Sequence, residues 1–241
     1  MPRYFIEVSY KGTNYSGFQV QLNANSVQAE IEKALEIFYK QKFELTGSSR
    51  TDAGVHALQN YFHFDTETII RNEGYNLNAI LPDDIVVKKI FKVADDAHCR
   101  FDALSREYHY YIYQDKNPFL QGRAYYVPYT IDIDLLQQAA KEIMSHTDFT
   151  SFSKRNTQVK NFLCTIYASE WVEEMGCFIY KIKANRFLRG MVKGLVGTML
   201  LMGKKKITLE EFRAIIEAKD CTKADFSVPP DGLFLYKVVF P

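Results

Sequence analysis

The residues best suited to chemistry lie in one short segment of this 241-residue chain, between Ser48 and Ala57. Arg50 and Asp52 stand two residues apart among small residues that permit a tight turn, with apolar-rich segments on both sides. This pattern predicts a surface loop, where catalytic and binding side chains are usually carried. An ionised carboxylate on such a loop can act as a nucleophile toward carbon. The alternative is an ordinary turn aspartate that hydrogen-bonds its own backbone.

The order of residues in this segment is more specific than their types. The run R-T-D-A-G-V-H, residues 50–56, resembles the signature of the TruA family of tRNA pseudouridine synthases. Residues 10–21 similarly resemble the family's first motif, Y-x-G-T-x-x-x-G-F-Q-x-Q, and residues 228–233 resemble its A-P-x-x-G-L segment. The resemblance therefore covers nearly the whole chain.

In that family the aspartate of the R-T-D run is the essential catalytic residue, which implies this role for Asp52. The implied reaction detaches uracil from ribose C1′, turns the base and rejoins it through C5. It needs a nucleophile that adds reversibly to C6 or to C1′. Arg50 is implied to enter the RNA stack when the target nucleotide is flipped out. We expect further substrate contacts from Thr51, Gln19 and Gln21.

A cation is needed near such a carboxylate, because burial beneath a substrate base disfavours the charged form. The family supplies it from a helix with the pattern F-x-x-x-M-V-R. The matching stretch here is 187–193, so the cation falls on Lys193 instead of an arginine. Lysine is a point charge and cannot make the two-pronged contact of a guanidinium.

Periodicity predicts that this helix runs from Arg186 to Met202. Arg186 and Arg189 would then share one face with Lys193 and contact the substrate. Small residues recur on the same helix, which predicts close approach by the catalytic strand. These are Gly190, Gly194 and Gly197.

Tyr108 lies in a tyrosine-rich strand predicted over 106–113 and matches the family's active-site tyrosine in R-x-Y-x-Y-x-I. The resemblance implies that its ring stacks on the target base and that its hydroxyl assists removal of the C5 proton. Tyr110, Tyr111 and Tyr113 fit better as ordinary sheet residues. His56 is expected to brace the loop, and a general-base role is the alternative.

The elements that must position these residues predict an α+β fold. Strands are expected at 4–10, with one face buried, and at 42–47, 58–65, 85–93, 163–172, 176–184 and 233–240. Helices are expected from Ser26, with Asn25 and Gln28 at capping-box spacing, from Asp134, and after the capping box Thr208–Glu211. We predict two lobes, 1–103 and 104–241. The resemblance implies the pseudouridine synthase fold, a central mostly antiparallel sheet in two lobes flanked by helices with an active-site cleft between them.

The composition of the chain limits which binding partners and cofactors are expected. The chain has 30 basic and 29 acidic residues, a net charge of +1, which argues mildly against a nucleic-acid binder, although the basic residues cluster locally. Its four cysteines form no C-x-x-C pair, and its five histidines show no metal-ligand spacing. We therefore expect no metal, no organic cofactor and no membrane segment, and a cytoplasmic protein.

The resemblance further implies a homodimer that binds tRNA and acts on uridines 38–40 of the anticodon stem-loop. Two alternatives stay open. One is a nucleoside or glycoside hydrolase that uses Asp52 with a second carboxylate. The other is a catalytically weak or silent RNA-binding paralogue, in which Lys193 marks a lost catalytic partner.

Overall fold

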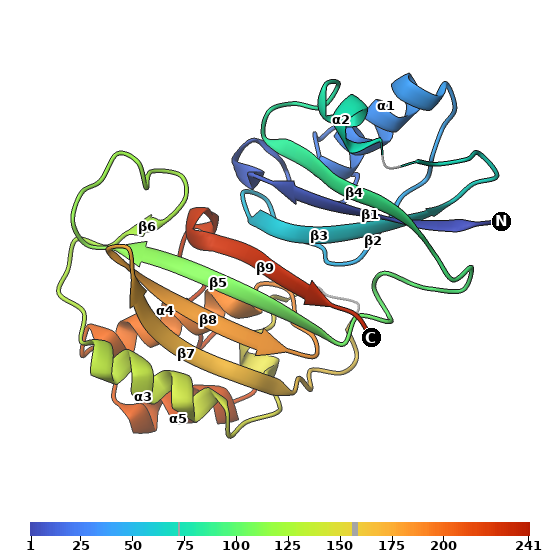
Figure 1. Ribbon diagram of the computed structural model, residues 1–241. Coiled ribbons are helices and arrows are strands. Elements are labelled where there is room, and N and C mark those ends of the chain that lie inside the picture. The colour runs from blue at the N-terminus through green and yellow to red at the C-terminus, as the bar shows by residue number, and fades with distance from the viewer. Residues whose placement is uncertain (72, 156–158) are drawn as a thin grey trace. The chain divides into compact units, whose positions relative to one another are not determined.

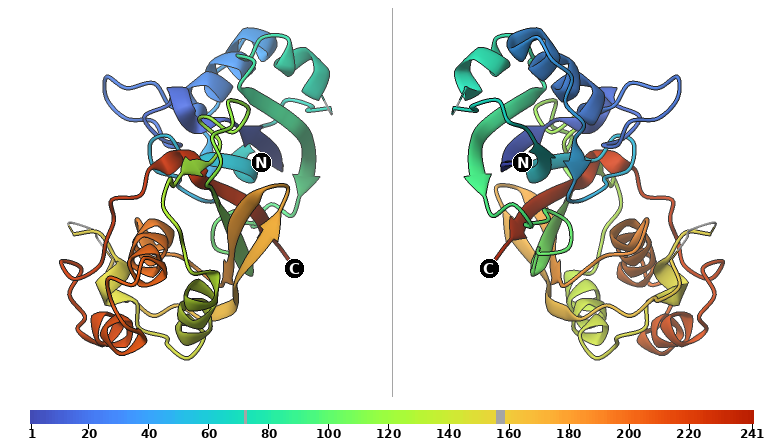
Figure 2. Two further views of the ribbon diagram at one scale, coloured as in Figure 1. Left: turned by 90° about the vertical axis from the view of Figure 1, so that its left-hand side faces the viewer. Right: turned by 90° about the vertical axis from the view of Figure 1, so that its right-hand side faces the viewer.

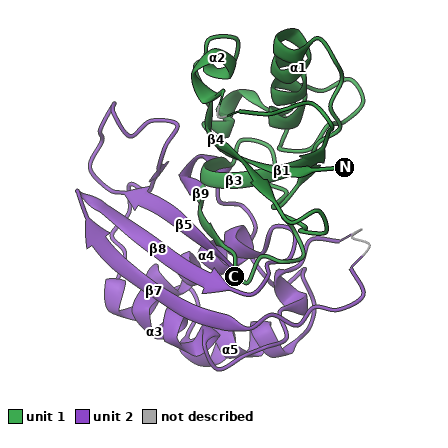
Figure 3. Cartoon of the chain, turned by 45° about the vertical axis from the view of Figure 1, so that its right-hand side comes forward, with its two compact units in different colours: residues 1–104, 234–241 green, residues 105–233 purple. Residues whose placement is uncertain are grey.

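A computed structural model describes residues 1–71, 73–155 and 159–241. The chain forms two compact units (Figure 3). Unit 1 comprises residues 1–104 together with 234–241, and unit 2 comprises residues 105–233. Both contain antiparallel strands and helices, which confirms the expected α+β class.

Unit 1 is built on strands in the order β4 (Ile85–Val93), β1 (Arg3–Tyr10), β3 (His56–Asp65) and β9 (Leu233–Val239). β1 pairs antiparallel with both β3 and β4, whereas β9 runs parallel to β3. The short β2 (Thr46–Gly47) also pairs with β3, so the strand expected over 42–47 is mostly loop.

Both faces of this sheet are covered by aromatic side chains. On the face toward the helices, Phe18 stacks on Phe62 with ring centroids 4.3 Å apart. On the other face, Phe5 contacts Tyr61 and Phe240. The prediction that only one face of β1 is buried is therefore wrong, because the end of the chain returns to cover the second face.

Two helices lie over one face of unit 1 (Figure 1), α1 (Val27–Tyr39) and α2 (Gly74–Asn78). Ser26 caps α1, since its side chain accepts the Ala29 N–H at 3.2 Å. The predicted Asn25–Gln28 capping box is not the cap, because Asn25 bonds the Asn14 carbonyl instead. α2 was not predicted, because five residues carry too little periodicity to show a helix.

The last strand belongs with the first half of the chain. β9 pairs with β3 at His56↔Phe234 and Ala57↔Leu235, and the Val238 N–H donates to the Gln59 side chain at 3.1 Å. The sequence-based division placed all of 104–241 in one lobe, whereas the structure assigns 234–241 to unit 1. Parallel pairing between strands so distant in sequence leaves no local signal.

Unit 2 contains β5 (Ser105–Tyr113), β8 (Cys177–Ala184) and β7 (Ile166–Glu174) in antiparallel order, with the short β6 (Tyr125–Tyr126) parallel to β5. Its helices are α3 (Ile133–Ile143), α4 (Met191–Gly203) and α5 (Leu209–Glu217). They lie together on one side of that sheet (Figure 2). α4 is almost entirely buried, and the capping box of Thr208 and Glu211 at the start of α5 is confirmed. Within the described residues, no helix is long and apolar enough to cross a membrane.

An ion pair joins two helices of unit 2. Arg213 of α5 donates through Nε and Nη2 to both carboxylate oxygens of Glu142 on α3, at 2.9 and 2.7 Å. His146 Nε2 lies 2.9 Å from the same carboxylate. The Arg213 guanidinium lowers the pKa of Glu142 to about 2.

We predict that Glu142→Gln lowers the melting temperature of the protein by about 2–5 °C at pH 7. The folded state lowers the carboxyl pKa from 4.5 to about 2. The stabilisation is therefore present above pH 4.5 and is lost as the pH falls toward 2. Melting curves at pH 7 and pH 3 check this, with the exposed Glu170→Gln on β7 as control. An equal difference at both pH values would contradict the assignment.

Candidate active site

The loop between β2 and β3 carries the residues to which the sequence assigned chemistry. It contains only bends and one turn, from Asp52 to Val55. The Val55 N–H donates to the Asp52 carbonyl at 3.2 Å, and Gly54 has φ +77°. Glycine adopts this left-handed conformation without strain. The predicted tight turn is present.

The first motif, residues 10–21, packs against this loop through its backbone. The Phe18 N–H donates to the Thr51 carbonyl at 3.1 Å, and the Gly54 N–H donates to the Tyr15 carbonyl at 3.3 Å. Gly12 approaches more closely, since a Cβ atom there would lie 2.0 Å from the Val55 carbonyl oxygen. The motif is therefore a scaffold for the loop, a role that the sequence analysis did not assign. The glycines of the motif are the feature of the sequence from which this scaffold role could have been predicted.

His56 opens β3 and is 1% exposed. Its Nδ1 accepts the Gly12 N–H at 3.0 Å, and its ring centroid lies 4.5 Å from that of Phe234. A buried imidazole held in this way favours the bracing role over the general-base alternative.

The side chains of the loop point in different directions. Arg50 is exposed and Asp52 is half-buried, so both are accessible. Thr51 is turned inward, with 7% exposure, and its hydroxyl lies 2.8 Å from that of Tyr10. This geometry does not favour the substrate contact expected of Thr51. Gln19 and Gln21 are exposed, as a substrate contact requires.

Tyr108 is half-buried on β5 of unit 2. Its ring meets that of Phe187 edge to face, with centroids 4.9 Å apart and an interplanar angle of 77°. Tyr110, two residues on, is fully buried and its hydroxyl donates to the Pro229 carbonyl at 2.7 Å. Tyr110 is therefore a core residue, and Tyr108 is the accessible one of this pair.

α4 begins at Met191, five residues later than predicted. Gly190 is its N-cap with φ +74°, a conformation that cannot continue a right-handed helix. Arg186 and Arg189 precede the helix, so the predicted common helical face with Lys193 is wrong. Lys193 lies half-buried in the first turn of α4, Arg186 is half-buried, and Arg189 is exposed.

The glycines of α4 do allow close approach, but by a different segment. A Cβ atom on Gly197 would lie 2.2 Å from the Asp225 carbonyl oxygen, and one on Gly194 would lie 2.7 Å from the Phe226 ring. The Thr198 hydroxyl also accepts the Asp225 N–H at 3.0 Å. The partner is thus the chain at 225–226 and not the predicted catalytic strand.

One cluster of potential metal ligands occurs among the described residues. His63, His98 and Cys99 place their ligating atoms within 4.8 Å of one another, which their separation in sequence concealed. The Cys99 thiol donates to the Thr46 carbonyl at 3.2 Å, and His98 Nδ1 accepts the Arg100 N–H at 3.1 Å. These bonds within the protein favour a structural role for the cluster.

Cysteine chemistry is disfavoured at Cys164. Burial raises the pKa of this thiol to about 11, although nearby Arg186 opposes the shift. The thiol is therefore uncharged at neutral pH, and the thiolate is the nucleophilic form.

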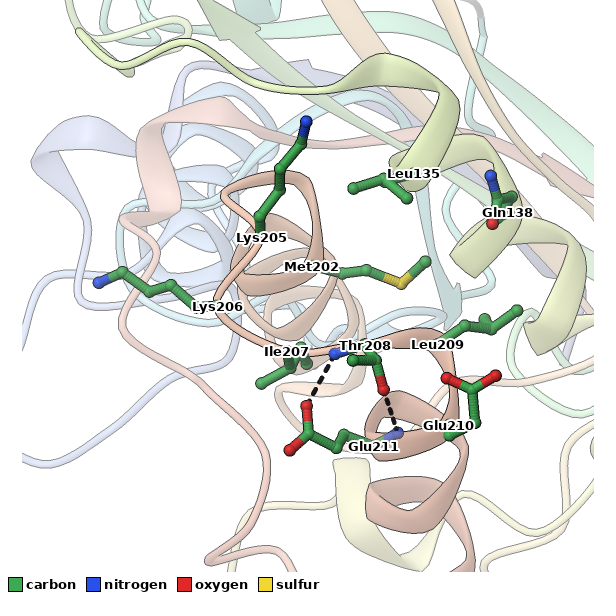
Figure 4. A pocket seen from close by; sticks show the side chains of 10 residues that line it. All are labelled: Leu135, Gln138, Met202, Lys205, Lys206, Ile207, Thr208, Leu209, Glu210 and Glu211. Atoms are coloured by element: carbon green, nitrogen blue, oxygen red, sulfur yellow. Dashed lines mark hydrogen bonds between the residues drawn. The ribbon is translucent and has the colours of Figure 1, made fainter.

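A pocket of about 430 Å³ lies at the C-terminal end of α4 (Figure 4). Its wall includes Met202, Lys205 and the capping box of Thr208 and Glu211, whose hydrogen bonds are drawn. Lys193 is about nine residues away along the same helix, roughly 14 Å. The pocket is therefore separate from Lys193, and Tyr108 is not among its lining residues.

Comparison with known proteins decides the family. A sequence profile described as tRNA pseudouridine synthase matches residues 6–102 and 139–241. The chain belongs to the tRNA pseudouridine synthase family. A relative from Parabacteroides distasonis, named tRNA pseudouridine synthase A, is 44% identical over all of this chain and 97% of its own length. A relative with that name from Bacteroides thetaiotaomicron is 44% identical over 100% of this chain and 91% of its own length. One from Staphylococcus aureus is 38% identical over 98% of this chain and 90% of its own length.

Membership confirms the resemblance drawn from the R-T-D run and the expected pseudouridine synthase fold. Pseudouridine synthases are isomerases, so the family is one of enzymes. In this synthase the loop of Asp52 lies in unit 1, whereas Tyr108 and Lys193 lie in unit 2.

We predict that Gly12→Ala disturbs the loop of this synthase. The added methyl group would clash with the Val55 carbonyl, so either the loop or the first motif must shift. A shift on the order of 1 Å in a catalytic group can cost about 10²-fold in rate. Single-turnover rates and melting temperatures check this, with exposed Thr13→Ala in the same turn as control. Wild-type values of both in Gly12→Ala would contradict the packing role.

Proposed function

We propose that this protein isomerises uridine to pseudouridine in tRNA, with Asp52 as the nucleophile. The observation that carries the proposal is the loop of Arg50 and Asp52. Its backbone is hydrogen-bonded to the first motif, while both side chains remain accessible. The family supports the reaction, and the relatives are named for it.

The reaction needs no oxidant, reductant or second substrate. The N1–C1′ bond breaks, a C5–C1′ bond forms, and the proton lost from C5 is balanced by one gained at N1. An ionised carboxylate can add to C6 or to C1′ and can leave again, as carboxylates do in glycosidases. We therefore propose that the synthase works without a cofactor.

Two further residues are proposed to act on the base. Tyr108 would stack on the flipped uracil, and its hydroxyl would assist removal of the C5 proton. Arg50 would fill the space that the flipped nucleotide leaves in the stack, which offsets part of the cost of flipping. Arg186, Arg189, Gln19 and Gln21 are proposed to contact the RNA.

Lys193 is proposed to supply the charge that keeps Asp52 ionised. It stands in the first turn of α4, where the helix dipole is positive and a cation is disfavoured by about 0.3–1 kcal/mol. A lysine at such a position favours an anionic partner, either a carboxylate or a phosphate. The family pattern, which has arginine here, favours the carboxylate.

The modified positions in tRNA, the oligomeric state and the compartment are proposed from the family alone. We propose that uridines 38–40 of the anticodon stem-loop are modified, that the enzyme is a homodimer, and that it works in the cytoplasm. Four free cysteines agree with a reducing compartment. Mapping pseudouridine in tRNA from a strain that lacks the protein tests the positions. Unchanged tRNA at 38–40 would contradict them.

The first prediction concerns the nucleophile. Asp52→Asn keeps the size of the side chain but removes its negative charge, so turnover should fall by more than about 10³-fold, equivalent to about 4 kcal/mol of barrier. The affinity for tRNA should stay near the wild-type value. Chromatography of digested tRNA measures pseudouridine and free uracil together.

The product also separates the alternatives. Pseudouridine identifies a synthase, free uracil a hydrolase, and tRNA binding without either product a silent RNA-binding paralogue. Activity of Asp52→Asn within about tenfold of wild type would remove the carboxylate from the mechanism.

The second prediction concerns the cation. Lys193→Met should lower the single-turnover rate and move the acid limb of the pH–rate profile to higher pH, because the carboxylate loses the opposite charge that favours its ionised form. Lys193→Arg should retain or raise the rate, since a guanidinium can make the paired contact. Rates and binding constants are compared on one tRNA at fixed salt.

Exposed Lys160→Met in unit 2 is the matched control for the loss of one positive charge. It should weaken RNA binding slightly, if at all, and should leave the acid limb in place. A Lys193→Met variant with a normal acid limb and only weaker binding would assign Lys193 to a phosphate contact.

A further inference from the structure

A buried set of hydrogen bonds lies under the catalytic loop and takes no part in the steps above. The Tyr10 hydroxyl on β1 lies 2.8 Å from Thr51 Oγ1 in the loop. Asn60 on β3 donates through Nδ2 to that same hydroxyl at 3.2 Å and to the Ser49 carbonyl at 2.8 Å. The two strands thus hold the loop at the residues immediately before and after Arg50.

Asn60 makes three of the four hydrogen bonds open to its amide. Both amide hydrogens have acceptors, and Oδ1 accepts the Tyr61 N–H at 2.9 Å. The side chain is completely buried. A buried amide that uses both hydrogens and its oxygen favours one geometry, because a displacement leaves a buried polar group without a partner.

The strand pairing changes at the same place. β1 and β3 are in register at Val8↔Asn60, but the next pair is Tyr10↔Ala57, so β3 has one extra residue. Such bulges bend a strand and redirect its side chains, and they recur beside active sites. The irregularity lies between Asn60 and the start of β3, where the loop joins the sheet.

We propose that Asn60 and Tyr10 are positioning residues that orient Arg50 for flipping the target nucleotide. Neither touches the substrate. Each fixes the backbone on one side of Arg50, Asn60 through the Ser49 carbonyl and Tyr10 through the Thr51 hydroxyl. The exposed guanidinium of Arg50 is then carried by a backbone that is held by hydrogen bonds on both sides. This inference rests on the proposed function and adds residues that act through Arg50.

The test uses Tyr10→Phe, which removes the hydroxyl but keeps the ring. Single-turnover rates are measured on two anticodon stem-loop RNAs, one with the target uridine paired and one with it opposite a mismatched base. Flipping costs less from a mismatch. We expect a loss of about 10–100-fold on the paired substrate and less than about threefold on the mismatched one, with unchanged binding at fixed salt.

Tyr4→Phe is the matched control, because Tyr4 lies on the same strand with its ring stacked on Phe64. It should react like wild type on both RNAs. Thr51→Val removes the other end of the Tyr10 bond, so its loss should not add to that of Tyr10→Phe in the double variant. All rates are measured well below each variant's melting temperature.

Equal losses on the two RNAs would overturn the proposal, since the network would then serve a step after flipping. Full activity of Tyr10→Phe on the paired RNA, or additive losses in the double variant, would also overturn it. Failure of the proposed function looks different, because the wild-type protein would then form no pseudouridine on either RNA.

Discussion

The close approach of Gly12 to the Val55 carbonyl is the contact on which the loop of Arg50 and Asp52 depends. A loop without secondary structure must find partners for its backbone groups elsewhere. Here the first motif supplies partners for the Thr51 carbonyl and the Gly54 N–H, and it lies this close because Gly12 has no side chain at the point of contact. The same residue donates its N–H to His56, which opens the strand that follows the loop. One position in the chain therefore fixes both the turn of Asp52 and the start of β3.

Holding the loop against the sheet buries polar groups, and the free-energy cost of that burial is offset by the rest of unit 1. Polar groups of the loop are buried, and burial of a polar group without a partner is destabilising. The Ser48 and Ser49 hydroxyls are two that are buried without a hydrogen-bond partner among the residues that the structure describes. Aromatic packing on both faces of the sheet provides the apolar burial that keeps the unit folded around them. The side chains of Arg50 and Asp52 stay accessible on this packed unit.

Sequence patterns predicted the long strands of both units well, because alternation reports directly on a pleated sheet. The exception is 42–47, where only Thr46 and Gly47 form a strand. Sequence patterns misplaced the start of α4. The apolar periodicity continues through Gly190, but the backbone of Gly190 is left-handed and is not part of the helix. Motif similarity is the source of the proposed roles of Asp52, Tyr108 and Lys193. It did not reveal that Thr51 points inward, because the direction of a side chain depends on Tyr10, forty-one residues away in the chain. Contacts of that range leave no periodic signal.

The return of the last strand has a consequence for synthesis on the ribosome. β3 pairs with β1 and with the short β2, both of which are made before it, but His56 and Ala57 pair with Phe234 and Leu235 of β9, which follow unit 2 in the chain. During translation the edge of β3 beside the catalytic loop therefore stays open while all of unit 2 is made. Open strand edges are prone to pairing with other chains. The nascent protein must therefore keep residues 56 and 57 of β3 from pairing with other chains until β9 has been made.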